Sequence, residues 1–276
     1  MKFKDKVVIV TGAASGIGRA IINMFANEGA KVVLADINER GIIELEQELK
    51  SKGVDATAVH TDVTNLEMIK NLINKTIQKH GKIDVMCNNA GIILPGDIDV
   101  TDYSSIDKQI YINLYGIIRG TKEVLPIMKK QGYGHIVNTS SLAGIVPEPG
   151  SAIYSATKFG IRGFDLAVRL ELKNTGVSIS TIMPDSTETP QLHYEATHGG
   201  SAMSFLGEPQ KPENVANGVA NAILKNKIEV YVPHSQGIIA RIALMFPWLM
   251  PMLWPMLEKQ GLKNKEEKIK KLTQKK

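Results

Sequence analysis

A glycine-rich turn near the start of the chain, between an apolar run and a helix-like segment, most constrains the fold. Residues 7–10 read Val-Val-Ile-Val, which is typical of a buried parallel strand. The turn after them has the spacing G-x-x-x-G-x-G. Glycines in such a turn let backbone N–H groups approach a pyrophosphate at the N-terminus of a helix. The pattern predicts a dinucleotide site, with Gly12, Ser15, Gly16, Ile17 and Gly18 as its candidates.

An acidic residue ends the second predicted strand. Asp36 lies eighteen residues beyond Gly18, about where a carboxylate hydrogen-bonds the adenosine ribose of NAD. A carboxylate there would repel the extra phosphate of NADP, and residues 13–15 contain no basic side chain to attract it. Asp36 therefore predicts NAD as the preferred cofactor. The alternative is that Asp36 only caps the helix expected to start near Asn38.

Tyr154 and Lys158 stand four residues apart, and Ser141 precedes Tyr154 by thirteen residues. In a helix over 152–175 both side chains would project from one face. A phenol with a pKa near ~10 is a poor base at neutral pH, and a fixed ammonium beside it lowers that pKa. The pair predicts a proton donor and acceptor for alcohol–ketone chemistry. The alternative is an ordinary solvated helix face.

Strand-like and helix-like segments alternate along the chain, which predicts an α/β fold, a single-domain Rossmann-type doubly wound parallel sheet of about seven strands. We expect residues 1–237 to form the dinucleotide-binding and catalytic domain, and 238–276 an extension. The predicted strands are 6–11, 31–36, 56–60, 83–88, 134–139, 177–183 and 228–232, and the predicted helices are 17–28, 39–52, 65–80, 104–130, 152–175 and 212–226. Several motifs follow strand ends, so they should converge on one crevice.

The chain resembles the short-chain dehydrogenase/reductase family from about residue 5 to about residue 233. The resemblance rests on the glycine turn, Asn88 to Gly91, Asn113 in I-N-L-Y-G, Ser141 in N-T-S-S, and Tyr154 with Lys158. It implies that Tyr154 is the general acid/base and that Ser141, with Ser140 as the neighbouring alternative, bonds the substrate oxygen. It also implies that Lys158 binds the nicotinamide ribose and that Asn113 holds a water in a proton relay. Further cofactor contacts implied by the resemblance are Asp62, Val63, Asn89, Ala90, Gly91, Pro184, Thr187 and Thr189, together with Tyr154 and Lys158.

The chain departs from the family pattern after the sixth predicted strand, where Pro184 is followed by Asp185 instead of glycine. A carboxylate near the nicotinamide would favour its oxidised, positively charged form. Residues 185–210 are too long for an ordinary connection and are expected to close over the substrate. The apolar roof that we predict consists of Leu192, Tyr194, Met203, Phe205 and Leu206.

The C-terminal extension combines an apolar stretch with a basic tail. Residues 238–257 contain one charged residue, Arg241, and three prolines that argue against a regular helix. Residues 259–276 hold eight lysines and two glutamates, a net charge of +6. The basic pI thus belongs to the tail, and we expect no nucleic-acid partner. The apolar stretch either covers the pocket or another subunit, or docks with the lysines on an anionic membrane.

These features predict an NAD-dependent oxidoreductase that interconverts a secondary alcohol and a ketone on a hydrophobic, steroid-like or lipid-like substrate. The alternatives are a carbonyl reductase acting on a carrier-bound or polar substrate and a non-catalytic dinucleotide-binding protein. The scattered histidines show no metal-ligand spacing, so no metal is expected. The single cysteine, Cys87, fits a reducing compartment, and no apolar signal segment precedes the first strand. We expect a cytoplasmic homodimer or homotetramer, with membrane contact limited to the periphery through 238–276.

Overall fold

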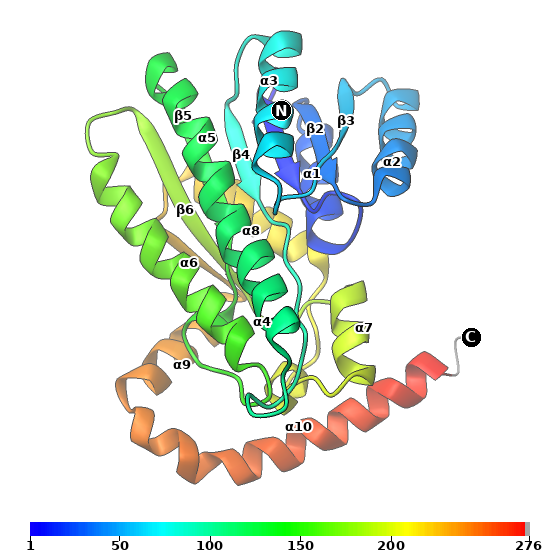
Figure 1. The fold of residues 1–276 in the computed structure, drawn as a ribbon, viewed down its shortest axis with the longest axis vertical. Coiled ribbons are helices and arrows are strands. Elements are labelled where there is room, and N and C mark those ends of the chain that lie inside the picture. Colours follow the sequence, from blue (N-terminus) through cyan, green and yellow to red (C-terminus); the bar gives the residue numbers. More distant parts are fainter. Residues whose placement is uncertain (274–276) are drawn as a thin grey trace.

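The computed structural model describes residues 1–273, and one parallel seven-stranded sheet lies at its centre (Figure 1). The strand order is β3-β2-β1-β4-β5-β6-β7, so the chain reverses its direction across the sheet between β3 and β4. This confirms the predicted single Rossmann-type sheet. Its strands are β1 (Val7–Thr11), β2 (Lys31–Asp36), β3 (Ala56–His60), β4 (Val85–Asn88), β5 (Gly134–Thr139), β6 (Val177–Pro184) and β7 (Glu229–Val232).

Helices cover both faces of the sheet. One layer consists of α1 (Gly16–Asn27), α2 (Glu39–Ser51) and α8 (Pro212–Leu224), and the other of α3 (Leu66–His80), α5 (Gly116–Gln131) and α6 (Ala152–Glu171). Alternate side chains of a strand point to opposite faces. Val8 and Val10 therefore enter the first core, and Ile9 between them enters the second. Because both faces are buried, β1 has no polar alternation.

The helix predicted over 104–130 is divided into three parts. These are α4 (Tyr103–Gln109), a π-helical turn, η1 (Ile110–Tyr115), and α5. A π-helical turn inside an α-helix is frequent at functional sites. Here the turn carries Asn113, which is completely buried.

The segment 185–210 is more ordered than a simple loop. It contains α7 (Pro190–Thr197) and a 3₁₀ turn, η3 (Ala202–Phe205). Pro190 occupies the first turn of α7, where its missing N–H costs nothing. The Thr189 hydroxyl caps this helix by accepting a hydrogen bond of 3.4 Å from the backbone N–H of Leu192.

The C-terminal extension is helical, and the expectation that its prolines prevent a regular helix is wrong for residues 250–273. It comprises α9 (His234–Met245), a 3₁₀ turn, η4 (Pro247–Leu249), and α10 (Met250–Thr273). Pro251 lies in the first turn of α10, where no backbone donor is needed, and Pro255 is accommodated inside the helix. Only Pro247 coincides with a break.

The extension wraps around one end of the molecule, and α10 runs beneath α7 in Figure 1. It packs on η3 and α7. Within residues 1–273, none of the helices has by itself the length and hydropathy to cross a membrane. Helix α9 and residues Pro247–Lys270 meet that criterion only when taken together, and they are bent by 93° relative to each other.

Candidate active site

A cavity of about 360 Å³ opens at the carboxyl ends of the strands. Its wall takes residues from the ends of five strands: Gly12 after β1, Asp36 of β2, Asn89 after β4, Ser141 after β5 and Pro184 of β6. Ligands of open α/β sheets bind where the strand order reverses. The predicted convergence on one crevice is therefore present.

The glycine turn is closely packed against the loop after β4. Gly12 has φ +69°, and a Cβ there would lie 2.9 Å from the Cα of Ala90. A Cβ on Gly18 would lie 1.9 Å from the carbonyl oxygen of Gly12. The Thr11 hydroxyl joins the two loops by accepting hydrogen bonds from the backbone N–H groups of Asn89 (3.0 Å) and Ala90 (3.2 Å). These positions need glycine for steric reasons.

The N-terminus of α1 fits a pyrophosphate. Ser15, Gly16 and Ile17 line the cavity at this helix end. Ser15 is the N-cap residue, yet its side chain caps no backbone N–H, and the first turn contains no acidic residue. Such an end favours a bound anion because of its free N–H groups and its helix dipole.

Asp36 lies at the far end of the same cavity. Its carboxylate accepts hydrogen bonds from the backbone N–H groups of Ala14 and Asn38, both at 2.9 Å. The cap of α2 is Asn38, whose side chain accepts from the N–H of Gly41 at 3.0 Å. Capping is thus not the role of Asp36. Asp62 and Val63 also line this end of the cavity. The Asp62 carboxylate accepts two hydrogen bonds of 2.8 Å, from the backbone N–H and from the hydroxyl of Thr64.

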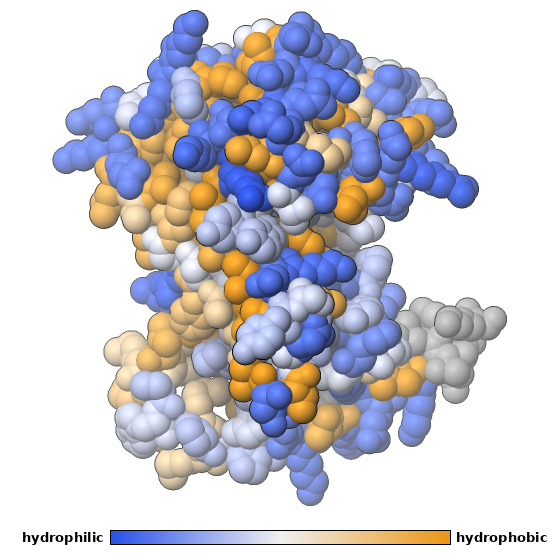
Figure 2. Space-filling model, in the orientation of Figure 1, coloured by the Kyte–Doolittle hydropathy of each residue, from blue (hydrophilic) through white to orange (hydrophobic). Residues whose placement is uncertain are grey.

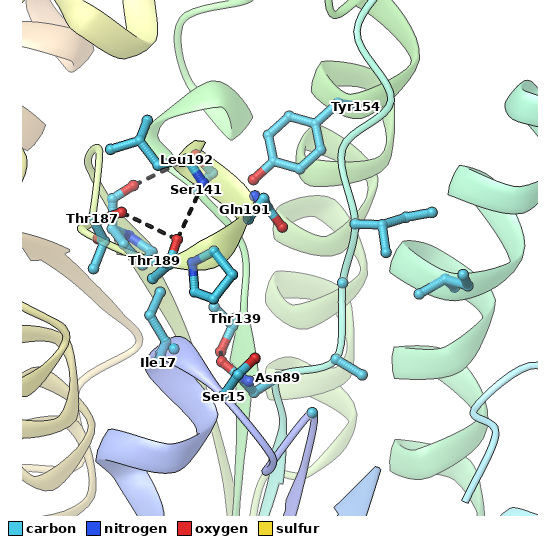
Figure 3. A pocket seen from close by; sticks show the side chains of 18 of the residues that line it. Ser15, Ile17, Asn89, Thr139, Ser141, Tyr154, Thr187, Thr189, Gln191 and Leu192 are labelled. Carbon is cyan, nitrogen blue, oxygen red and sulfur yellow. Dashed lines mark hydrogen bonds between the residues drawn. The ribbon is translucent and has the colours of Figure 1, made fainter. Parts of the chain in front are cut away.

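Tyr154 and Lys158 project from α6 into the cavity opposite Ser141. The Lys158 ammonium lies 5.3 Å from the Tyr154 ring centroid and donates a hydrogen bond of 3.0 Å to the carbonyl of Thr139. Figure 3 shows the Tyr154 hydroxyl turned toward Ser141 and Gln191. A ketone or alcohol oxygen placed between Ser141 and Tyr154 would meet two hydroxyl groups.

The structure also separates the two neighbouring serines. The Ser140 hydroxyl donates to the main-chain carbonyl of Lys158 at 2.8 Å, which fixes α6 on β5. The Ser141 hydroxyl accepts from the N–H of Ala143 at 3.1 Å, makes a long contact of 3.5 Å to the carbonyl of Pro184 and faces the Tyr154 phenol inside the cavity. Ser141 is therefore the one free to bond a ligand.

Burial controls the charge of the central pair. Desolvation, reinforced by the charges of Glu148 and Glu195, raises the pKa of Tyr154 above its ordinary value. Burial lowers the pKa of Lys158 to about 8. The predicted lowering of the tyrosine pKa by the lysine is thus wrong for this structure, because a low-dielectric site penalises the phenolate and the ammonium alike.

Asn113 stands behind the cavity wall. Its side-chain oxygen accepts from the N–H of Ile92, and its amide donates to the carbonyl of Ile92, both at 2.8 Å. The amide also contacts the Thr157 hydroxyl at 3.3 Å. Asn113 thereby holds the loop after β4 against α6, and its role in a proton relay stays a prediction. Gly18 likewise supports the wall from behind, and the other predicted site residues all line the cavity.

Three carboxyl groups line the cavity beside Tyr154: Glu148, Asp185 and Glu195. Burial raises the pKa of Glu148 to about 8 and that of Glu195 to about 7, and it also raises the pKa of Asp185. The Glu195 carboxylate accepts a hydrogen bond of 2.9 Å from Ser204. Glu148 and Glu195 carry no sequence motif, and the sequence interpretation missed both. Within residues 1–273, no group of three or more His, Cys, Asp or Glu side chains could hold a metal ion.

The predicted apolar roof is largely wrong. Leu192 is buried and lines the cavity. Phe205 and Leu206 line a separate hollow against α10, and Tyr194 is exposed and stacks on His198. The orientation of α7 and η3 turns these side chains away from the cavity, and that orientation depends on tertiary packing that the sequence does not display. Polar Gln191, Glu195 and Ser204 take their places on the wall.

The sheet, the glycine turn and the Ser141–Tyr154–Lys158 arrangement define a nicotinamide-dinucleotide-dependent oxidoreductase acting on CH–OH groups. The chain belongs to the short-chain dehydrogenase/reductase family, because the family model for short chain dehydrogenases matches residues 6–198.

Similar proteins agree with this assignment. The 3-oxoacyl-[acyl-carrier-protein] reductase FabG of Thermotoga maritima is 36% identical over 219 residues, covering 78% of this chain and 89% of that protein. A short-chain dehydrogenase/reductase from Burkholderia phymatum, solved in complex with NAD, superposes with a TM-score of 0.81 at 26% identity, covering 91% of this chain and 96% of the other. The 3-ketoacyl-(acyl-carrier-protein) reductase of Brucella melitensis, complexed with NADH, gives a TM-score of 0.76 at 27% identity and covers 83% and 97%.

Proposed function

We propose that this protein interconverts a secondary alcohol and a ketone with NAD as its cofactor. The observation that carries the proposal is that one cavity is lined by Ser141, Tyr154 and Lys158 at one end and by Asp36 at the other. When bound, the dinucleotide supplies or accepts the hydride. The protein has to bind and orient the dinucleotide and the substrate, and it has to move a proton.

Tyr154 moves the proton in this scheme. Its raised pKa keeps the phenol protonated at neutral pH, as a donor to a developing alkoxide must be. Ser141 offers a second, neutral hydrogen bond to the same oxygen. Lys158, whose ammonium lies 5.3 Å from the Tyr154 ring centroid, would hold the nicotinamide ribose. In alcohol oxidation the same groups act in reverse, and Tyr154 must first lose its proton.

The choice of NAD over NADP rests on Asp36. Its carboxylate lines the adenosine end of the cavity and would repel a 2′-phosphate. Two similar structures, from Burkholderia phymatum and Brucella melitensis, were solved with NAD and NADH. Both observations support NAD.

The predicted hydrophobic substrate needs refinement, because the wall near Tyr154 is mixed. Leu142, Ile92 and Leu192 stand beside Glu148, Gln191 and Glu195. We propose an amphipathic substrate, with an apolar body and a hydrogen-bond donor near the reacting carbon. The similarity to FabG favours a second candidate, reduction of a carrier-bound 3-oxoacyl group.

A spectrophotometric screen tests the proposal. Steroid, fatty and short secondary alcohols with NAD⁺, and 3-oxoacyl thioesters with NADH, should be followed at the absorbance of the reduced nicotinamide. Tyr154→Phe should lower kcat by roughly 10²–10⁴-fold while NAD⁺ still binds. Tyr133→Phe, at an exposed tyrosine that does not line the cavity, is the matched control. Undiminished turnover in Tyr154→Phe refutes the mechanism, and dinucleotide binding without turnover of any compound favours the non-catalytic alternative.

The outer faces of α4 to α6 suit subunit packing, as in the expected homodimer or homotetramer. Exposed apolar side chains gather there, namely Tyr103, Tyr111, Tyr115, Leu166 and Leu170. This surface is separate from α9 and α10. We propose a cytoplasmic assembly through it, which light scattering of Leu170→Glu would test by a fall in mass.

A further inference from the structure

The chain exposes an unusual apolar surface where α9 and α10 meet. We define the apolar elbow as residues 238–256. Trp248 is 64% exposed, and Met245 and Met252 are each 72% exposed. The elbow holds ten of the large apolar side chains that are exposed among the described residues: Ile238, Ile239, Ile242, Leu244, Met245, Phe246, Trp248, Met252, Leu253 and Met256. An exposed surface of this kind marks an interaction site.

The elbow is presented on a firm base. On the inner side of α9, a Cβ at Gly237 would lie 2.1 Å from the Tyr231 ring, and Ala240 is buried. Beyond the elbow, a Cβ at Gly261 would lie 2.2 Å from the carbonyl of Ala202, and the Asn264 amide donates to the carbonyl of Phe205 at 2.8 Å. Both ends are thus seated on the catalytic domain. The bend of 93° leaves the corner between them pointing outward.

Charge is distributed along the extension in the way that a bilayer surface requires. The elbow contains no acidic residue and one basic residue, Arg241. Lys259, Lys263 and Lys270 follow on the exposed side of α10, which also carries Glu266 and Glu267, and lysines outnumber glutamates along residues 257–270. Figure 2 shows pale tan and light-blue atoms where α9 and the start of α10 lie, and darker blue atoms mixed with orange ones farther along α10. Tryptophan and methionine beside lysine suit the boundary between acyl chains and anionic headgroups.

We propose that the apolar elbow inserts into the surface of an anionic lipid bilayer and anchors the enzyme there peripherally. Neither helix is long and apolar enough to span the bilayer alone, and the bend directs the corner, not a helix axis, at the membrane. A second copy of the chain is the less suitable occupant. A two-fold contact through the elbow would bring the Lys259 and Lys263 rows of the two copies together, whereas anionic headgroups attract both rows.

Docking through the elbow would also orient the pocket. Helix α10 runs from the elbow onto the segment that covers the cavity, where Lys265 donates to the carbonyl of Gly200 at 2.8 Å. Lys268 forms an ion pair of 2.6 Å with Glu188. The membrane anchor and the substrate segment are therefore mechanically joined. An amphipathic substrate could then reach the cavity from the bilayer side.

Vesicle binding of the full chain tests the proposal. The protein should co-sediment with vesicles of phosphatidylcholine and phosphatidylglycerol, and less with phosphatidylcholine alone or at high salt. The variant Ile239→Ser/Trp248→Ser/Met252→Ser should bind at least about ten-fold more weakly. Its matched control, Ile98→Ser/Val100→Ser, changes apolar residues of similar exposure, 57% and 77%, that lie outside the elbow, the cavity and the proposed subunit surface, and it should bind as the parent does. Unchanged melting temperature and turnover in both variants show that folding is intact.

Fluorescence gives an independent measurement, because Trp248 and Trp254 are the only tryptophans. In Trp254→Phe, emission from Trp248 should shift to the blue when anionic vesicles are added. Absence of vesicle binding, or binding that the triple variant leaves intact, overturns the proposal. The proposal is also overturned if the triple variant binds vesicles as the parent does but forms a smaller assembly. That result would show that the elbow contacts a second copy of the chain.

Discussion

Replacing Gly18 by alanine would test whether the glycine turn is shaped by close packing. The added Cβ would lie 1.9 Å from the carbonyl oxygen of Gly12, 2.7 Å from its carbonyl carbon and 2.8 Å from the side-chain nitrogen of Asn89. An ordinary contact needs at least 3.4 Å, so the turn has to move by about 1.5 Å. Overpacking of this kind costs roughly 1–3 kcal/mol. A shift of about 1 Å in a positioning element can cost about 10²-fold in function.

Gly163→Ala is the matched control for this change. Gly163 also lies in a helix, α6, and a Cβ there would meet no atom within 4 Å. Alanine should stabilise that helix by roughly 0.5–1 kcal/mol. Calorimetry should therefore find that Gly18→Ala binds NAD⁺ about 10²-fold more weakly and melts earlier, while Gly163→Ala binds normally and melts slightly later. A Gly18→Ala protein with parental affinity and melting temperature would refute the steric reasoning.

Three further changes probe charge in the cavity. Asp36→Asn keeps the size of the side chain but removes its charge, so the NADP⁺/NAD⁺ affinity ratio should rise about ten-fold; an unchanged ratio contradicts the assigned role. Burial raises the pKa of Glu195 to about 7. The parent therefore loses stability as the pH rises from the ordinary pKa of a glutamate toward 7, because the unfolded chain releases this proton first. Glu195→Gln should accordingly melt later than the parent near pH 8 and equally near pH 4, and equal melting at both would disprove the burial argument. Burial lowers the pKa of Lys158 to about 8, so the parent gains stability from about pH 8 toward its unfolded value. Lys158→Met should melt later than the parent at pH 8, and this difference in melting temperature should shrink as the pH rises toward the unfolded pKa of lysine. A difference that stays constant over that pH range contradicts the lowered pKa of Lys158.

The sheet could be predicted because its information is local. β1 is a short apolar run, Val7–Thr11, that ends in a glycine turn, and β2 ends in Asp36. The predicted motifs stand where strands end, and parallel strands bring their carboxyl ends to one edge. The cavity wall could therefore be assembled from residues far apart in the chain.

The substrate end could not be predicted, because it depends on contacts between distant segments. Glu148 and Glu195 lie 47 residues apart and meet only because α7 folds back over the cavity. Helix α10 contains Pro255 and would be a poor helix by propensity alone. It is stabilised by contacts that no local pattern displays, including those of Gly261 with Ala202 and of Asn264 with Phe205.

The behaviour of Tyr154 shows why spacing alone misjudged the electrostatics. A charged Lys158 at about 5 Å would favour the phenolate by about 3 kcal/mol at an effective dielectric constant near 20. Tyr154 and Lys158 are only 8% and 4% exposed, however, and desolvation acts against both charges. Glu148 and Glu195 add repulsion when they ionise. The proton on Tyr154 therefore depends on the protonation of these two carboxyl groups, which titrate near neutral pH. Their ionisation strengthens the hold of the phenol on its proton, which opposes alcohol oxidation and leaves the tyrosine a poorer acid for ketone reduction.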